Sequence, residues 1–117
     1  MAKNENRVKP IRFTAENGEV YTLEFSRDTV RFAEQRGFKI DELTAYPQTN
    51  IPALWYFAFR MHHRNVARSQ SDAMLDSLGG LTARELERLV QLYNQTFESL
   101  IVDEGEERKN SKVTMEL

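Results

Sequence analysis

The sequence has 117 residues, 40% of them hydrophobic and 29% charged, which is typical of one small globular domain. It contains no cysteine, which excludes disulfides, thiol nucleophiles and thiolate metal sites. Its 16 basic and 18 acidic residues give a net charge of −2, which argues against the strongly positive field of a typical nucleic-acid-binding domain.

The chain shows no targeting or membrane-spanning signal. Residues 1–9 lack the apolar stretch of a signal peptide, and the longest apolar run, residues 53–59, is far shorter than the roughly 20 residues that span a bilayer. We therefore expect a cytoplasmic protein that does not enter a membrane. Its predicted organisation is one α+β domain over residues 1–102, with a flexible start at residues 1–9, and a charged, mobile tail over residues 103–117.

The first predicted element is a β-hairpin. An Asn-Gly turn signal separates two segments in which apolar and polar residues alternate. A three-residue loop that ends in a left-handed Gly18 opposes Phe13 to Tyr21 and Ile11 to Leu23. This register gathers the apolar side chains on one face, which helices must cover because a lone hairpin is only marginally stable.

Two helices are predicted after the hairpin. Ser26 is a favourable N-cap for a helix over residues 27–36. After a helical turn near residues 41–45, a second helix is predicted over residues 51–65, with Pro52 in its first turn. This second helix is the most apolar segment of the chain, and its wide stripe can be buried on two faces.

Two further helices complete the predicted fold. The third starts at Ser69 or Ser71 and stops at the glycine pair 79–80. The fourth starts with a capping box formed by Thr82 and Glu85. We expect burial of the whole apolar stripe of this last helix, which consists of Leu86, Leu89, Val90, Tyr93, Phe97, Leu100 and Ile101. The predicted fold class is α+β: an N-terminal β-hairpin packed on a bundle of about four helices, the last one long and amphipathic.

No catalytic or metal-binding constellation is evident. The two histidines, His62 and His63, are adjacent on a predicted helix and project about 100° apart, so they cannot chelate one ion as an i, i+4 pair would. No phosphate-binding loop and no acid–base pair stands out. We therefore expect no metal, no cofactor and no enzymatic activity.

The segment LTARELERL at residues 81–89 is similar to the opening of helix-turn-helix domains of response regulators. Such a domain needs a second, recognition helix with basic and amide side chains. Residues 85–107 instead hold seven acids and Arg88 as the one base, which would repel phosphate. The capping box is the favoured interpretation, and a small DNA-binding regulator with a helix-turn-helix-like element at residues 81–97 is the alternative function.

Charge segregation points to a binding surface. Residues 44–71 contain no acid, and three arginines recur there at i, i+4 spacing, where like charges repel if the helix continues. Either the acidic last helix offsets them, or the stripe and two neighbouring aromatic residues bind another protein, since Trp and Arg are enriched at binding hot spots. For the aromatic residues, core packing is the competing interpretation. The predicted partner-binding residues are Trp55, Phe59, Arg60, Arg64 and Arg68.

A resemblance to a known family rests on a series of positions between residues 11 and 93. They are Asn17-Gly18, Tyr21-x-Leu23-x-Phe25, Arg27, Thr29-Val30, Glu34, Gly37-Phe38, Ile51-Pro52-x-Leu54 and Phe57-Ala58-Phe59 before His62. In this order the sequence resembles a family of small phage and prophage proteins of Gram-positive bacteria. Those proteins are similar in size and layout to the tail assembly chaperones of long-tailed phages.

The resemblance implies a non-enzymatic tail assembly chaperone. Such a protein binds the long helical tape measure protein, keeps it soluble, and helps tail-tube subunits assemble around it without staying in the virion. The expected partners are therefore the tape measure protein and the tail tube protein, together with further copies of this chain, and not nucleic acid. The resemblance supplies no binding residues.

Overall fold

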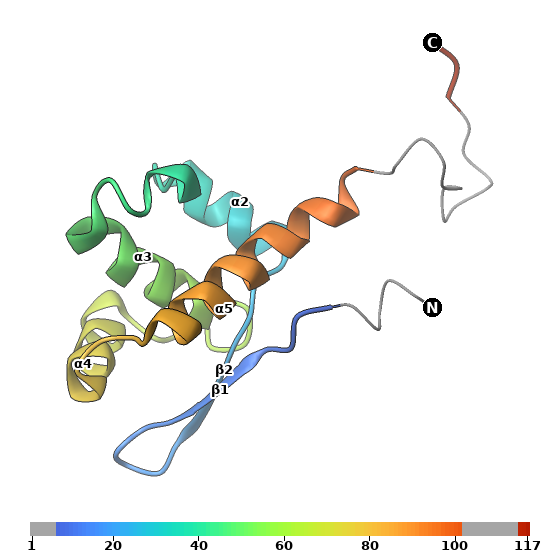
Figure 1. Ribbon diagram of the computed structural model, residues 1–117. Coiled ribbons are helices and arrows are strands. Elements are labelled where there is room, and N and C mark those ends of the chain that lie inside the picture. Colours follow the sequence, from blue (N-terminus) through green and yellow to red (C-terminus); the bar gives the residue numbers. More distant parts are fainter. Residues whose placement is uncertain (1–6, 102–114) are drawn as a thin grey trace.

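The computed structural model describes residues 7–101 and 115–117 of the chain. In this part a β-hairpin is followed by four α-helices and two 3-10 helices, which confirms the α+β fold (Figure 1). The elements are β1 (Ile11–Thr14), β2 (Val20–Leu23), α2 (Arg27–Gln35), η1 (Ile40–Glu42), α3 (Pro47–Phe59), α4 (Arg68–Leu78), α5 (Ala83–Gln95) and η2 (Thr96–Ser99). The flexible start and the mobile tail expected from the sequence fall mostly outside the described residues.

The hairpin has the predicted register. Phe13 lies opposite Tyr21 and Ile11 opposite Leu23 in the antiparallel pair. In the turn the Gly18 N–H donates to the Ala15 carbonyl, and Gly18 has a φ of 87°, a conformation that glycine adopts without strain. The predicted three-residue loop is therefore confirmed.

Helix α2 also begins and ends as predicted. The Ser26 hydroxyl accepts a hydrogen bond from the Thr29 N–H, and the Ser26 N–H donates to the Thr29 hydroxyl. At the other end the Gly37 N–H donates to the Glu34 carbonyl and the Phe38 N–H donates to the Ala33 carbonyl. This pair of bonds is the Schellman arrangement, which a left-handed glycine permits.

The predicted boundaries of the central helix were wrong at both ends. Helix α3 begins at Pro47 rather than at residue 51, because proline in the first helical turn lacks only an N–H that has no helical partner. Pro52 consequently lies inside the helix. The α-helix ends at Phe59 rather than at residue 65. Beyond it the apolar pattern ceases, and one further turn is closed by the His63 N–H, which donates to the Phe59 carbonyl.

The last two helices start near the predicted positions. Helix α4 runs from Arg68 to Leu78, and the residue that caps its end, Gly79, is left-handed with a φ of 76°. The capping box of α5 is confirmed, since the Glu85 N–H donates to the Thr82 hydroxyl and the Thr82 N–H donates to the Glu85 carboxylate. The α-helix ends at Gln95, and the chain continues as the 3-10 helix η2.

Helix α3 forms the centre of the core. It packs against α2, α4, α5 and strand β2, and Figure 1 shows it between these elements. Six of its last seven residues are buried, and they meet apolar side chains of the hairpin and of α5, among them Leu23, Phe25, Leu89 and Leu92. The wide apolar perimeter expected of this helix is thus covered within one chain.

Candidate protein-binding surface

Trp55 and Phe59, predicted to bind a partner, lie in the core. Their side chains are 2% and 1% exposed. The Trp55 indole N–H donates to the Ser71 carbonyl at 2.8 Å, and its ring packs edge-on against Phe13 and Phe59 at centroid distances of 5.4 and 5.1 Å. The predicted role of these two side chains as an exposed surface is therefore corrected, and the competing interpretation, core packing, describes them.

The three arginines do not form one stripe. Because α3 ends at Phe59 and α4 begins at Arg68, a non-helical turn separates Arg60 from Arg68, and the i, i+4 relation that would place them on one face is lost. Arg64 lies exposed in this turn. The prediction of a continuous arginine surface is therefore wrong.

Each end of the arginine series has local partners instead. The Arg60 guanidinium carbon lies 3.5 Å from the centre of the Phe32 ring. Arg68 donates to the Asp72 carboxylate at 3.2 Å, one turn along its own helix. Among residues 7–101 and 115–117, no ion pair joins α5 to any of these arginines, so the acidic last helix does not offset them as the sequence had suggested.

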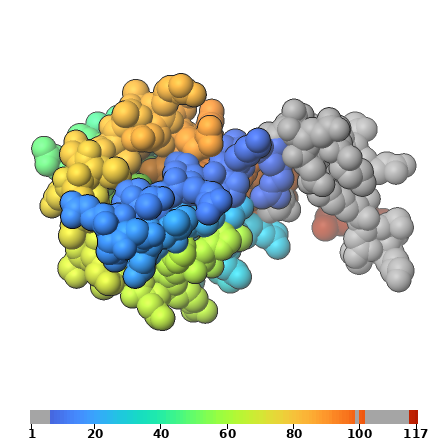
Figure 2. All heavy atoms as spheres, turned by 90° about the horizontal axis from the view of Figure 1, so that it is seen from below, coloured from blue at the N-terminus to red at the C-terminus, as the bar shows by residue number. Residues whose placement is uncertain are grey.

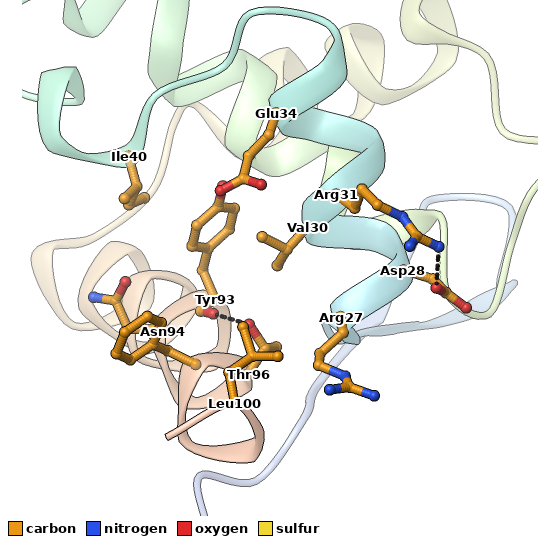
Figure 3. Close-up of a pocket in the computed structure, with 11 residues that line it drawn as sticks. Arg27, Asp28, Val30, Arg31, Glu34, Ile40, Tyr93, Asn94, Thr96 and Leu100 are labelled. Carbon is orange, nitrogen blue, oxygen red and sulfur yellow. Dashed lines mark hydrogen bonds and ion pairs between the residues drawn. The ribbon is translucent and has the colours of Figure 1, made fainter. Parts of the chain in front are cut away.

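A different surface is open to a partner, in a groove between α2 and the end of α5 with η2. The groove has a volume of about 640 Å³. Its apolar lining consists of Val30, Ile40, Tyr93, Phe97 and Leu100. Its polar lining consists of Arg27, Asp28, Arg31, Glu34, Asn94 and Thr96. Figure 3 shows the two helices as the sides of the groove, with Val30 and Tyr93 directed into the space between them.

The predicted apolar stripe of the last helix is exposed at its end. Phe97, Leu100 and Ile101 are 61%, 58% and 54% exposed, whereas Leu89 and Tyr93 in the same stripe are buried. The change coincides with the transition from α-helix to 3-10 helix after Gln95. A 3-10 helix has 3.0 residues per turn instead of 3.6, so side chains beyond this point rotate out of line with the stripe. The expected burial of these three residues was wrong.

The groove is charged at its edge and apolar inside. Arg31 and Asp28 form an exposed ion pair of 2.7 Å on α2. Arg27 has no ion-pair partner within the described part of the chain. Burial is the main cause that raises the pKa of Tyr93 to about 12, and the negative charge of Glu34 adds to it. The Tyr93 phenol therefore stays neutral at physiological pH. Figure 3 shows the Tyr93 ring reaching from α5 toward Glu34.

This arrangement suits a protein partner. Two helices flank an apolar trough whose edge carries charge of both signs, which is the geometry that accepts the apolar face of an amphipathic helix. The sequence predicted the apolar stripe of the last helix, which forms one wall of the trough. It did not indicate that the end of this stripe would be left uncovered by the neighbouring elements. It also did not indicate that Val30 and Ile40 would line the trough, because only the fold brings α2 and η1 beside the end of α5.

The histidines have separate structural partners. His62 contacts the Glu24 carboxylate at 2.8 Å, and His63 accepts the Thr22 N–H at 2.9 Å. In the described ranges, no group of three or more His, Cys, Asp or Glu side chains is placed to hold a metal ion. None of the helices described here is both long and apolar enough to cross a bilayer.

The helix-turn-helix alternative requires a second helix after the one that begins at the capping box. Helix α5 is followed by η2, and residues 96–101 and 115–117 contain no second α-helix that could serve as a recognition helix.

Comparison with known proteins identifies a family that the chain matches. The family model described as a domain of unknown function, DUF5055, matches residues 1–117. No curated protein and no solved structure is significantly similar to the chain.

Proposed function

The chain belongs to the DUF5055 family, and from its exposed groove we propose that it is a non-enzymatic assembly chaperone that binds a long helical protein. The observation that carries this proposal is the apolar end of the last helix, where Phe97, Leu100 and Ile101 are each more than half exposed beside a trough of about 640 Å³. Contiguous apolar surface of this kind marks protein interaction sites.

The proposed mode of binding is a helix in the groove. The partner contributes apolar residues at i, i+3, i+4 and i+7, which fill the space between α2 and η2 and cover Phe97 and Leu100. Covering these side chains while the partner is unassembled keeps both proteins soluble. The sequence resemblance to phage tail assembly chaperones supports the tape measure protein as this partner, since it is long, helical and apolar along one face. Several copies of the chain would be needed along such a partner.

Co-expression tests the proposal. The chain is produced together with a phage tape measure protein, and the soluble fraction of that protein is measured with and without the chain. We expect the chain to raise the soluble fraction and to co-purify with the partner. No gain in solubility and no co-purification would refute the proposal, and binding of the chain to duplex DNA with a steep salt dependence would favour the regulator instead.

Paired variants locate the surface. Phe97→Glu with Leu100→Glu places charge at the groove and should reduce co-purification at least ~10-fold, since about 1.4 kcal/mol of lost binding free energy is tenfold in affinity. The control is Tyr46→Glu with Leu78→Glu, two apolar residues outside the groove lining that are 63% and 45% exposed. Both double variants should unfold at nearly the wild-type urea concentration, because exposed positions contribute little to stability. Equal loss of binding in both would show that the groove is not the site.

A further inference from the structure

The side chain of His63 joins the outer edge of the hairpin to the segment that follows α3. The Thr22 N–H points away from β1 and donates to His63 Nε2 at 2.9 Å. Two residues further along the chain, the Glu24 N–H donates to the Ala58 carbonyl at 3.1 Å. Figure 2 shows the hairpin lying on the surface, with the chain segment that follows α3 along its lower side.

The direction of this bond fixes the state of the ring. Because Nε2 accepts the Thr22 N–H, His63 is neutral and its one ring proton is on Nδ1. Protonation puts a hydrogen on both ring nitrogens, so that the Nε2–H would face the Thr22 N–H and the hydrogen bond would be lost. The contact exists only while the histidine is uncharged.

The hairpin packs over two buried aromatic residues of α3, Trp55 and Phe59. Tyr21 packs edge-on against Phe59 at a centroid distance of 5.5 Å, and Phe13 packs against Trp55 at 5.4 Å. The Tyr21 ring also lies 4.9 Å from the His63 ring. Movement of the hairpin away from α3 would therefore uncover Trp55 and Phe59.

We propose that His63 is an acid-sensitive latch that holds the β-hairpin closed over Trp55 and Phe59. Protonation of His63 breaks the latch and increases the population in which the turn end of the hairpin has moved away from α3. The latch rests on the hydrogen bond to Thr22 and is independent of the groove and of the proposed chaperone function.

The environment of His63 and the charged groups around it set the pH at which the hairpin begins to open. Burial and the positive charge of His62 lower the pKa of His63, and Glu19 acts in the opposite direction. The folded-state pKa therefore lies below the ordinary value of 6.5, so the latch contributes fully above pH 6.5 and is lost as the pH falls through the folded-state pKa. His62 and Glu24 also lie beside the hairpin, with His62 Nε2 at 2.8 Å from the Glu24 carboxylate.

Amide hydrogen exchange measures the opening. Protection factors of the β2 amides are compared between about pH 7.5 and about pH 5, the range in which histidine titrates, each against the intrinsic exchange rate at the same pH. Loss of one net hydrogen bond changes an equilibrium by about 2- to 10-fold, so protection of the Thr22 amide should fall by this factor on acidification. An unchanged protection factor would overturn the proposal.

Two variants separate the latch from other titrations. His63→Gln removes the titrating group, so the acid-dependent fall should disappear, whether or not the shorter amide reaches Thr22. His62→Gln is the matched control and should keep the fall. A fall that persists in His63→Gln overturns the proposal. Nitrogen-15 shifts of the neutral wild-type ring give an independent test: a hydrogen on Nδ1 supports the latch, and a hydrogen on Nε2 refutes it.

Discussion

Replacing Trp55 by alanine distinguishes a core residue from an interface residue. In this structure Trp55 is 2% exposed, so the change leaves a cavity between α3, α4 and the hairpin instead of removing a surface contact. Truncation of a buried Trp to Ala costs about 3–5 kcal/mol. It also leaves the Ser71 carbonyl without the indole donor, which adds about 1 kcal/mol or more.

The expected total is a large part of the stability of the domain. At roughly 0.05–0.15 kcal/mol per residue, 117 residues give an unfolding free energy of about 6–18 kcal/mol. A loss of about 4–6 kcal/mol would lower the urea midpoint by about 2–3 M, with a slope of about 2 kcal/mol/M. Far-UV circular dichroism is the suitable probe, because Trp55 is the one tryptophan and the variant has no indole fluorescence.

A conservative variant provides the control. Trp55→Phe keeps an aromatic ring between Phe13 and Phe59 but removes the donor to Ser71, so we expect a smaller loss of about 1–3 kcal/mol. The core assignment would be refuted if Trp55→Ala shifted the midpoint by less than about 0.5 M and at the same time weakened binding to a partner.

Two further predictions concern the last helix. The pKa of Tyr93 is raised from the ordinary 10.0 to about 12, so its contribution to the stability of the fold is complete below pH 10 and is lost as the pH rises toward 12. The difference in phenolate absorbance between the wild type and Tyr93→Phe should show this late titration. A step near pH 10 in that difference would contradict the prediction. Thr82→Ala removes the capping hydroxyl of α5 and should cost about 1 kcal/mol in urea unfolding, whereas Thr82→Ser should cost little, and equal loss in both would argue against the cap.

The groove and the hairpin latch are built from different residues. The groove exposes apolar side chains in the structure as it stands, whereas the hairpin conceals the aromatic residues that the sequence suggested as a binding surface. A variant at Phe97 or Leu100 should therefore leave the acid response of the hairpin unchanged, and His63→Gln should leave groove binding unchanged. These two measurements show whether the groove and the latch act independently.

Local signals determined most of the secondary structure. The hairpin register follows from the alternation of apolar residues around a turn that needs a left-handed Gly18, and the caps formed by Ser26 and Thr82 depend on residues three positions apart. Interactions this close in the chain are visible in the sequence. The start of α3 is one exception, since proline is compatible both with ending one segment at Pro47 and with beginning a helix there.

The sequence by itself determined the α+β class, the order of the elements and the apolar faces that had to be buried. The tertiary structure decided which of those faces found a partner within the chain. Trp55 is enclosed because α4 and the hairpin close over it, and Phe97 is exposed because η2 carries it out of line with the stripe that α2 and α3 cover. Periodicity shows that a face is apolar, but burial depends on which distant segments reach that face, and this is set by packing across the whole chain.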